Sequence, residues 1–368
     1  MKTTQSINRI LVIKFSSLGD LVLLTPLLRE LRKLFPSAQI DLVTHSKFTA
    51  LFENNPHLNE VILFKKGKHI SGELSLFKTL TSNKYDLLID AHGSLRSRII
   101  SYLLWIKRLG KPRIKWIKKR YRLRYFLVNK WGMKVINNCG GSSRAFIQKH
   151  YRPQREIFLE PLKKLDPHYV INTKNASTEL FPTLEHVKKA EEVLGKYVDK
   201  KQRLIAISPS AQHELKEWGV DKYSQLIKQL PLQVHPIIIG LSKEKACQDL
   251  RSELPDCIFA LDQDYLTVAA ILKRCELTVA NDSLISHISE AVGTPTVTIF
   301  GPTVKEFGFA PFLTNSILVE SQLPCRPCTT NGKGLCKNEQ YLHGCMKECS
   351  VKQVLDEILK RVSVSTFD

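Results

Sequence analysis

Short apolar runs alternate with helix-like segments along most of this chain, and the alternation restricts the folds that it can adopt. In the first half, strand-like runs occupy 9–15, 40–44, 61–64 and 86–90. In the second half, they occupy 204–207, 236–239, 258–261, 277–280 and 296–300. Segments of helical character, such as 20–35, 74–81, 95–106 and 184–198, separate the runs. A repeated strand–helix order predicts an α/β protein, in which helices cover both faces of parallel sheets.

The length of the chain indicates two domains. A chain of 368 residues exceeds one typical core. The segment 170–183 is polar and contains Pro182, so we place a linker there. We therefore expect a Rossmann-like domain at 1–175, a second at 183–349, and a C-terminal helix and tail at 350–368. Such domains face each other across a cleft that can hold a ligand.

The net charge favours an anionic partner. Lys and Arg number 55 and Asp and Glu 35, which gives +20. Sixteen Lys and Arg but only two acidic residues lie in 101–160, and the stretch KRLGKPRIKWIKKRYRLRYF also carries Trp116, Tyr121, Tyr125 and Phe126. This pattern suits an anionic membrane surface or a phosphorylated glycolipid. Single-stranded nucleic acid is a competing but less favoured partner, and a plain solvated basic surface is the other alternative.

No apolar run approaches the roughly 18 residues that cross a bilayer. The N-terminal apolar run ends at Lys14 and does not have the pattern of a signal peptide. We therefore expect a cytoplasmic protein.

The most informative stretch is LTVANDSLISHISEAVGTPTVTIFGPT, residues 277–303, which has the order strand, helix, strand. Ligands of open parallel sheets bind at the carboxyl ends of strands, and a helix that begins there directs N–H groups toward an anion. Asp282 and Ser283 are candidates for binding the sugar or diphosphate of a nucleotide, and His287 follows one helical turn later. An ordinary buried strand–helix–strand unit without a ligand is the alternative.

A second candidate follows the first strand. Gly19 permits a tight turn, and Asp20 stands at the start of a helix. Asp20 is either a helix N-cap or a general base that takes a proton from an acceptor hydroxyl.

Two further loops follow strands of the second half. Ser208 and Ser210 are candidates for binding phosphate oxygens, and Lys216 for neutralising a leaving diphosphate, unless this is a solvated loop. Glu244 is a candidate for the ribose, or a partner of the helix dipole. In the first half, Arg96 and Arg98 follow a strand end and are candidates for an anionic acceptor.

Five of the nine cysteines cluster near the C-terminus. Cys325, Cys328, Cys336 and Cys345 have a spacing that is compatible with structural zinc. Packing without a metal is the alternative, and we assign packing to Cys349.

Three motifs, KFSSLGDLVLLTPLL, SPSAQHELKEW and NDSLISHISEAVGTPTVTIFGPT, occur in an order that resembles glycosyltransferase family 9, the lipopolysaccharide heptosyltransferases. The resemblance covers nearly the whole chain. It implies a GT-B fold, no catalytic metal, and inverting transfer of L-glycero-D-manno-heptose from ADP-heptose to the inner core of lipopolysaccharide. The acceptor would be lipid A bearing Kdo or an already heptosylated core, bound by the N-terminal domain of an enzyme peripheral to the inner face of the inner membrane.

By the same resemblance, Asp20 matches the proposed catalytic base and Lys216 the diphosphate-binding lysine. Asp282 matches the acidic residue that contacts the heptose, with Ser283 and His287 in the same donor loop. The family usually has Gly where this sequence has Leu284 and, in the middle loop, where it has Ser210. A side chain at 284 can narrow the pocket. The side chain at 284 therefore leaves another GT-B nucleotide-sugar enzyme with a different donor as an alternative. A basic membrane-binding or nucleic-acid-binding module is a further alternative.

Overall fold

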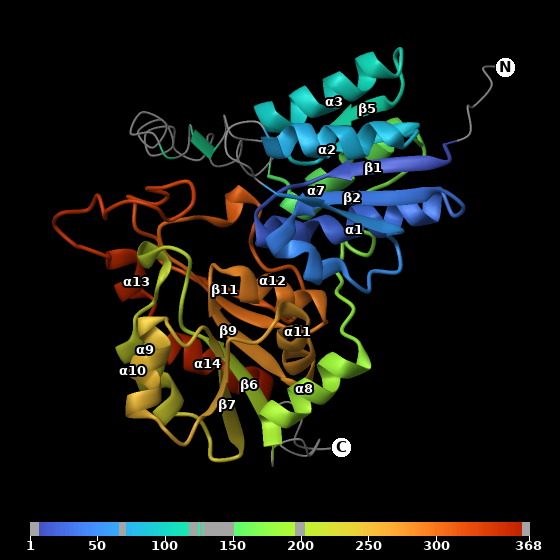
Figure 1. The fold of residues 1–368 in the computed structure, drawn as a ribbon. Coiled ribbons are helices and arrows are strands. Elements are labelled where there is room, and N and C mark those ends of the chain that lie inside the picture. The colour runs from blue at the N-terminus through green and yellow to red at the C-terminus, as the bar shows by residue number, and fades with distance from the viewer. Residues whose placement is uncertain are drawn as a thin grey trace. The chain divides into compact units, whose positions relative to one another are not determined.

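The computed structural model describes residues 7–65, 71–117, 124, 125, 128, 151–195 and 203–362. The chain forms two compact units, Met1–Lys119 with Gln154–Phe181 and Arg120–Pro153 with Pro182–Asp368. Each unit contains a parallel sheet with helices on both faces (Figure 1). This arrangement confirms the predicted α/β class. The chain crosses from the first unit to the second for the last time between Phe181 and Pro182, in the segment that we predicted to be a linker.

The first unit has a five-stranded sheet in the order β3-β2-β1-β4-β5. Its strands are β1 (Arg9–Ile13), β2 (Gln39–His45), β3 (Glu60–Phe64), β4 (Leu87–Asp90) and β5 (Arg113–Trp116). Its helices are α1 (Leu18–Leu34), α2 (Ser71–Ser82), α3 (Leu95–Lys107) and α7 (Gln154–Leu159), with the 3-10 helices η1 (Ser46–Phe52) and η2 (Glu160–Lys164). β1 is an almost continuous apolar run because helices cover the sheet on both faces.

The second unit has a six-stranded sheet in the order β11-β10-β9-β6-β7-β8. Its strands are β6 (Arg203–Ser208), β7 (Val234–Gly240), β8 (Ile258–Leu261), β9 (Leu277–Asn281), β10 (Thr296–Phe300) and β11 (Ile317–Glu320). Its helices are α8 (Leu184–Leu194), α9 (Val220–Lys228), α10 (Lys245–Glu253), α11 (Tyr265–Arg274), α12 (Leu284–Ala291), α13 (Gly344–Glu348) and α14 (Val351–Val362), with the 3-10 helices η4 (Glu214–Lys216) and η5 (Lys305–Phe307). The C-terminal helix α14 buries Val354, Ile358 and Val362 in the same apolar core as Trp218.

Two details of the helices differ from the sequence prediction. The helix expected at 184–198 ends at Leu194, and Gly195 follows with φ of 53°, a conformation that stops a helix. The first helix begins at Leu18, two residues before the predicted start, and Ser17 occupies the N-cap position. Asp20 therefore lies inside the first turn of α1, so the N-cap alternative for Asp20 is wrong.

The carboxyl ends of neighbouring strands bring loops together in each unit. In the first unit, the backbone N–H of Ala91, after β4, donates to the carbonyl of Ile13, at the end of β1. In the second unit, the N–H of Asp282, after β9, donates to the carbonyl of Ile299 in β10. The polar residues singled out in the sequence lie at these edges, where open parallel sheets bind ligands. Among the described residues, no helix combines the length and apolar character needed to span a membrane.

Candidate functional site

Lys216 and Asp282 form a largely buried ion pair at the carboxyl edge of the sheet of the second unit. The Nζ atom of Lys216 lies 2.7 Å from Oδ2 of Asp282, and their side chains are 14% and 7% exposed. Lys216 also donates to the carbonyl of Asp282 at 3.3 Å. The hydroxyl of Thr303 donates to the same Oδ2 at 2.7 Å. Two residues that the sequence placed in separate motifs, 66 positions apart, thus lie in direct contact.

Asn281 fixes the geometry of this ion pair. Its Oδ1 accepts from the backbone N–H of Trp218 at 3.1 Å and from the hydroxyl of Tyr223 at 3.2 Å. Its Nδ2 donates to the carbonyl of Pro209 at 2.8 Å. One buried amide therefore ties the loop that carries Lys216 to the end of β9. The sequence analysis did not assign this role to Asn281, although its position at a strand end, next to Asp282, is the signal.

Ser283 is the N-cap residue of α12, but its side chain makes no capping hydrogen bond. Its hydroxyl oxygen is buried and has no hydrogen-bond partner among the described residues. Buried polar atoms are nearly always paired, so an atom of this kind at a helix start indicates a place for a ligand oxygen. His287 is buried in the next turn of α12, and its ring centroid lies 6.3 Å from that of Phe309.

The other predicted donor-binding residues contact the protein itself. Ser210 is buried with its hydroxyl 3.9 Å from the Cys247 thiol. Glu244 accepts from the backbone N–H of Leu241 at 2.9 Å and lies 3.8 Å from the same thiol. The side chain of Ser208, at the end of β6, is buried. Their roles in donor binding stay predictions.

A loop that the sequence analysis did not connect with this site packs against Lys216. Gly332 has φ of +90°, and a Cβ atom there would lie 2.7 Å from Cγ of Lys216. Lys333 is close enough to influence His213. Burial lowers the pKa of His213, and the positive charges of Lys216 and Lys333 lower it further. Two lysines, Lys216 and Lys333, therefore lie near His213, and an anionic ligand bound there would offset their mutual repulsion.

In the first unit, Asp20 pairs with a buried lysine. The Nζ atom of Lys14 lies 2.7 Å from Oδ2 of Asp20. The Lys14 side chain is 1% exposed, whereas that of Asp20 is 22% exposed. The Lys14 ammonium also lies 5.5 Å from the centroid of the Phe158 ring. A nearby positive charge stabilises the ionised carboxylate, which is the form that accepts a proton.

Asp90 organises the neighbouring loop. Its Oδ1 accepts from the backbone N–H groups of His92 and Gly93 at 3.0 and 2.8 Å, and its Oδ2 accepts from the Ser97 hydroxyl at 3.0 Å. These bonds fix the start of α3, the helix that carries the two predicted acceptor-binding arginines.

Arg96 pairs with Glu73 of α2 and lies 5.9 Å from the centroid of the Phe64 ring. Arg98 lies 5.9 Å from the centroid of the Trp116 ring. Acceptor binding by these arginines stays a prediction.

The cysteine cluster lies in the second unit, and Cys325, Cys328, Cys336 and Cys345 are all free thiols. Burial raises the pKa of Cys328 to about 11, and the other three thiols contribute to the increase, so the four lie near one another. The backbone N–H of His343 donates to the sulfur of Cys336 at 3.3 Å. In the part of the chain that the structure describes, no group of three or more His, Cys, Asp or Glu is arranged to hold a metal ion. The structural zinc site stays a prediction. Cys349 is buried in the core of the second unit.

The basic stretch with interspersed aromatic residues is only partly described. Trp116 and Tyr125 are exposed, whereas Tyr121 and Phe126 lie outside the described residues.

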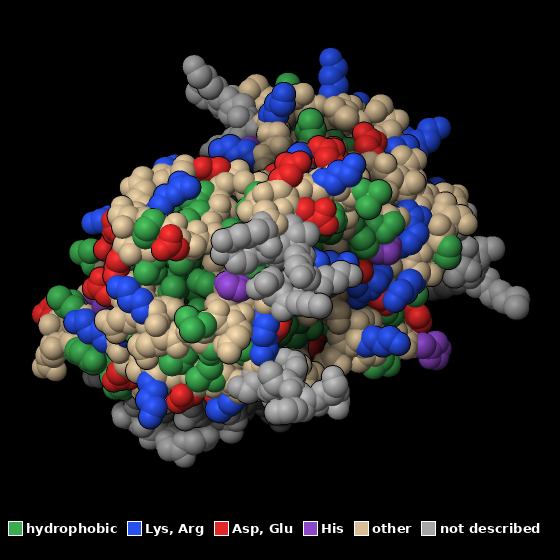
Figure 2. Space-filling view, turned by 90° about the horizontal axis from the view of Figure 1, so that it is seen from below, with side chains coloured by type: hydrophobic (Ala, Val, Ile, Leu, Met, Phe, Trp, Pro, Cys, Tyr) green, Lys and Arg blue, Asp and Glu red, His purple; other side chains and the backbone are tan. Residues whose placement is uncertain are grey.

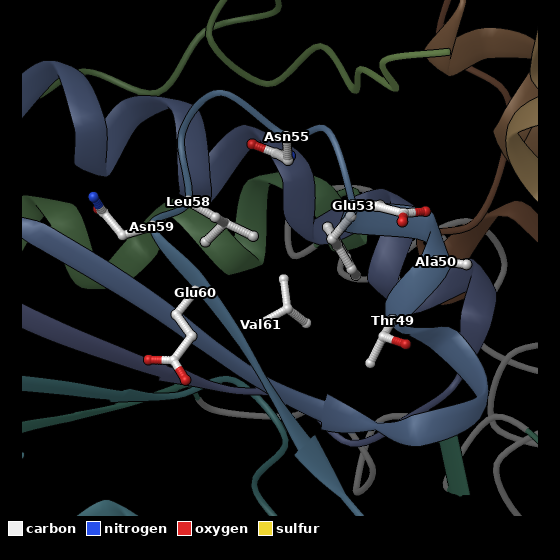
Figure 3. A pocket seen from close by; sticks show the side chains of 9 residues that line it. Thr49, Ala50, Glu53, Asn55, Leu58, Asn59, Glu60 and Val61 are labelled. Atoms are coloured by element: carbon white, nitrogen blue, oxygen red, sulfur yellow. The ribbon is translucent and has the colours of Figure 1, made fainter. Parts of the chain in front are cut away.

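A cavity of about 420 Å³ lies beside β3 and η1 (Figure 3). None of the predicted site residues lines it. Its two asparagines are engaged in the fold, because Asn55 Oδ1 accepts from the N–H of His57 and Asn59 Oδ1 accepts from the N–H of Ile40 and from Arg32. We assign this cavity no ligand.

Comparisons with known proteins agree with the motifs. The model of glycosyltransferase family 9 (heptosyltransferase) matches residues 139–339. Lipooligosaccharide heptosyltransferase 2 of Campylobacter jejuni subsp. jejuni serotype O:6 is 24% identical over 356 residues, which cover 93% of this chain and 96% of that protein. Lipopolysaccharide heptosyltransferase 3 of Escherichia coli (strain K12) is 25% identical over 301 residues, which cover 78% of this chain and 81% of that protein.

Two solved structures share the fold. A glycosyl transferase of family 9 from Veillonella parvula DSM 2008 superimposes with a TM-score of 0.74 at 19% identity, covering 98% of this chain and 99% of that one. The ADP-heptose lps heptosyltransferase II of E. coli superimposes with a TM-score of 0.70 at 18% identity, covering 98% of this chain and 100% of that one. These likenesses confirm the predicted GT-B class with two Rossmann-like domains.

Proposed function

The chain belongs to glycosyltransferase family 9, the heptosyltransferases, and from this premise we propose that it transfers L-glycero-D-manno-heptose from ADP-heptose to the inner core of lipopolysaccharide. One observation supports the donor half most strongly. The Lys216–Asp282 ion pair and the unpartnered hydroxyl of Ser283 occur together where β9 passes into α12. A cation, a free hydroxyl and a helix N-terminus are the groups that bind a diphosphate.

Lys216 is the proposed partner of the leaving diphosphate. Asp282, whose carboxylate accepts a hydrogen bond from Thr303, holds the ammonium before the donor arrives, so little reorganisation is needed when negative charge develops on ADP. Asp282 is then available to contact the heptose. Ser208, Ser210, Glu244 and His287 complete the proposed donor-binding set. No step of this mechanism uses a metal ion.

Asp20 is the proposed general base. An acceptor hydroxyl attacks the anomeric carbon of the heptose while the bond from that carbon to the diphosphate oxygen breaks, and the configuration inverts. The proton of the hydroxyl passes to the Asp20 carboxylate. Lys14 holds the orientation of the Asp20 carboxylate.

The proposed acceptor is lipid A bearing Kdo or an already heptosylated core. Both are anionic glycolipids, and Arg96 and Arg98 are the proposed contacts with their carboxylates or phosphates. An enzyme that acts on such an acceptor works at the inner face of the inner membrane, so we propose a cytoplasmic protein that binds this membrane peripherally. The concentration of cations in residues 101–160 supports the proposal.

A transfer assay that compares several sugar nucleotides as donors tests this function. The purified protein is given ADP-heptose with lipopolysaccharide that lacks heptose or carries one heptose, and ADP release and acceptor mass are measured. We expect ADP release only in the presence of an acceptor, together with the mass increase of one heptose. UDP-glucose and GDP-mannose are the controls. Faster transfer from one of these donors would identify a different GT-B enzyme and would direct attention to Leu284, which stands where the family usually has Gly.

A structural zinc ion in the cysteine cluster is a separate proposal. The thiols of Cys325, Cys328, Cys336 and Cys345 supply the donor set of such a site. Metal analysis of protein purified without chelators should give one zinc per chain, and a Cys325→Ser, Cys328→Ser variant should lose it. Wild-type protein without bound metal would reject this proposal and leave the transferase proposal intact.

A further inference from the structure

Helix α3 has an apolar face on each side. On the inner side, Ile100 and Leu104 are buried in the core of the first unit, together with the small residues Ser97 and Ser101. The outer side carries large apolar side chains that are between 38% and 77% exposed. They are Leu95, Ile99, Tyr102, Leu103, Trp105 and Ile106. A water-facing helix normally carries polar residues there.

The exposed apolar side continues into the turn after the helix. Leu109 is 96% exposed, and Trp116 in β5 is also exposed. Figure 1 shows α3 beside α2, and Lys107 lies 6.0 Å from the centroid of the α2 residue Phe77. Arg98 of α3 lies 5.9 Å from the centroid of the Trp116 ring in β5. We call the outer side of α3, with the following turn and Trp116 of β5, the α3 surface.

Positive charge surrounds the α3 surface. Residues 95–116 contain seven Lys and Arg and no Asp or Glu. Helical spacing puts Arg96 and Lys107 on one flank of the exposed apolar stripe and Arg98 on the other. Arg96 pairs with the acidic residue Glu73 of α2. By contrast, Lys and Arg are interspersed with Asp and Glu on the face seen in Figure 2.

We propose that the α3 surface docks on an anionic lipid bilayer, with Ile99, Ile106 and Leu109 in the interfacial layer and the flanking cations at lipid phosphates. Helices that lie in a membrane interface combine a large apolar face with cations along its borders. Each cation near an anionic leaflet adds attraction, which salt weakens. The inference deepens the proposed function, on which it rests for the lipid nature of the acceptor, by identifying the part of the protein that meets the membrane.

Two other occupants fit the α3 surface less well. A second copy of the chain, joined by a two-fold axis, would bring two sets of seven like charges together. Single-stranded nucleic acid stacks on aromatic rings, but Tyr102 and Trp105 stack on each other with centroids 5.7 Å apart, and aliphatic residues occupy the rest of the stripe.

Vesicle sedimentation tests the proposal. Vesicles of phosphatidylethanolamine with 30% phosphatidylglycerol are compared with vesicles of phosphatidylcholine. We expect the wild-type protein to sediment with the anionic vesicles only. The Ile99→Ser, Ile106→Ser variant should lose binding about tenfold or more, because both side chains leave the apolar layer. The Lys107→Glu, Arg108→Glu variant should also lose binding, and the remaining binding should be less sensitive to salt.

Matched controls are available in the second unit. Leu232 is 95% exposed, and Leu232→Ser should bind vesicles as the wild type does. Lys188 and Lys273 are exposed, and Lys188→Glu, Lys273→Glu makes the same change in net charge as the basic-flank variant. Vesicle binding that falls equally in this control would show a dependence on net charge alone and would overturn the proposal.

The remaining outcomes are also decisive. With acceptor dispersed in detergent, the serine variant should transfer heptose at the wild-type rate, so a failure of the proposed function is distinguishable from a failure of docking. Unchanged vesicle binding by the serine variant would overturn the α3 surface as the docking site. A serine variant whose oligomeric state differs from that of the wild type in the absence of vesicles would also overturn the proposal. Binding of single-stranded RNA by the wild-type protein in preference to vesicles would overturn it as well.

Discussion

The ammonium of Lys14 lies 2.7 Å from the carboxylate of Asp20, and Lys14 itself is almost completely buried. The fold of the first unit thus places a lysine side chain beside the proposed base. This contact fixes the direction of the Asp20 carboxylate, whose side chain is 22% exposed.

Replacing Lys14 with Met should slow turnover. The Asp20 carboxylate then loses the hydrogen bond that fixes its direction, so kcat should fall about tenfold while the KM for ADP-heptose stays close to that of the wild type. Arg9→Met is the control, because Arg9 pairs with Asp41 at 3.1 Å in the same sheet without contacting Asp20. Both variants should unfold at a lower temperature than the wild type, but only Lys14→Met should lower kcat. Equal kcat values for the two folded variants would reject the positioning role of Lys14.

Gly332→Ala should weaken ADP binding. Both Gly332 and Gly334 have φ in the left-handed region, so alanine at either costs about 1 kcal/mol of stability. A Cβ at 332 also meets the Lys216 side chain, whereas a Cβ at 334 has no heavy atom within 4 Å. Calorimetric titration with ADP should therefore show reduced affinity for Gly332→Ala and wild-type affinity for Gly334→Ala. Equal affinities in the two variants would contradict a role of this loop in placing Lys216.

The Lys216–Asp282 pair should show strong energetic coupling. Lys216→Met leaves a buried carboxylate without its cation, which costs about 3 kcal/mol, and the added change Asp282→Asn should recover part of that loss. Chemical denaturation of the two single variants and the double variant measures the coupling. ADP affinity should fall at least about tenfold in each variant without Lys216, because a charge-assisted bond to phosphate is lost. Additive stabilities would mean that the pair does not form in solution.

ADP affinity should rise as the pH falls through the titration of His213. Burial, Lys216 and Lys333 hold the pKa of His213 below 6.5 in the free protein. An anion bound nearby raises that pKa, so binding takes up a proton, and affinity increases between the pKa of the complex and that of the free protein. ADP affinity is measured as a function of pH for the wild type and for His213→Gln. In the variant, only the titration of the nucleotide phosphates should change the affinity with pH. The same dependence of affinity on pH in both proteins would place ADP away from His213.

Much of the fold follows from sequence periodicity. Continuous apolar runs such as Ile10–Ile13 mark strands that are covered on both faces, and these central strands were all predicted. The edge strands β5 and β11 were missed. β5 is four residues long and carries Arg113 and Lys115, so it lacks the apolar run that marks a buried strand.

The candidate site was predictable where its residues follow strand ends, because parallel strands bring those ends to one edge. This rule led to Asp20, Lys216, Asp282 and Ser283, and the structure brings the last three into one site. The contacts of Lys14 with Asp20 and of Gly332 with Lys216 depend on how loops return across the sheet. A lysine at a strand end and a glycine in a loop occur in many proteins without a role in binding or catalysis. The roles of Lys14 and Gly332 therefore could be inferred only from the structure.

The most direct test of the account compares wild-type protein with Asp20→Asn in two measurements on the same samples. The account predicts that turnover of ADP-heptose falls about 100- to 10,000-fold, as expected for loss of a general base, while ADP affinity and melting temperature stay close to those of the wild type. Undiminished turnover by Asp20→Asn would contradict the assignment of the base and, with it, the proposed mechanism.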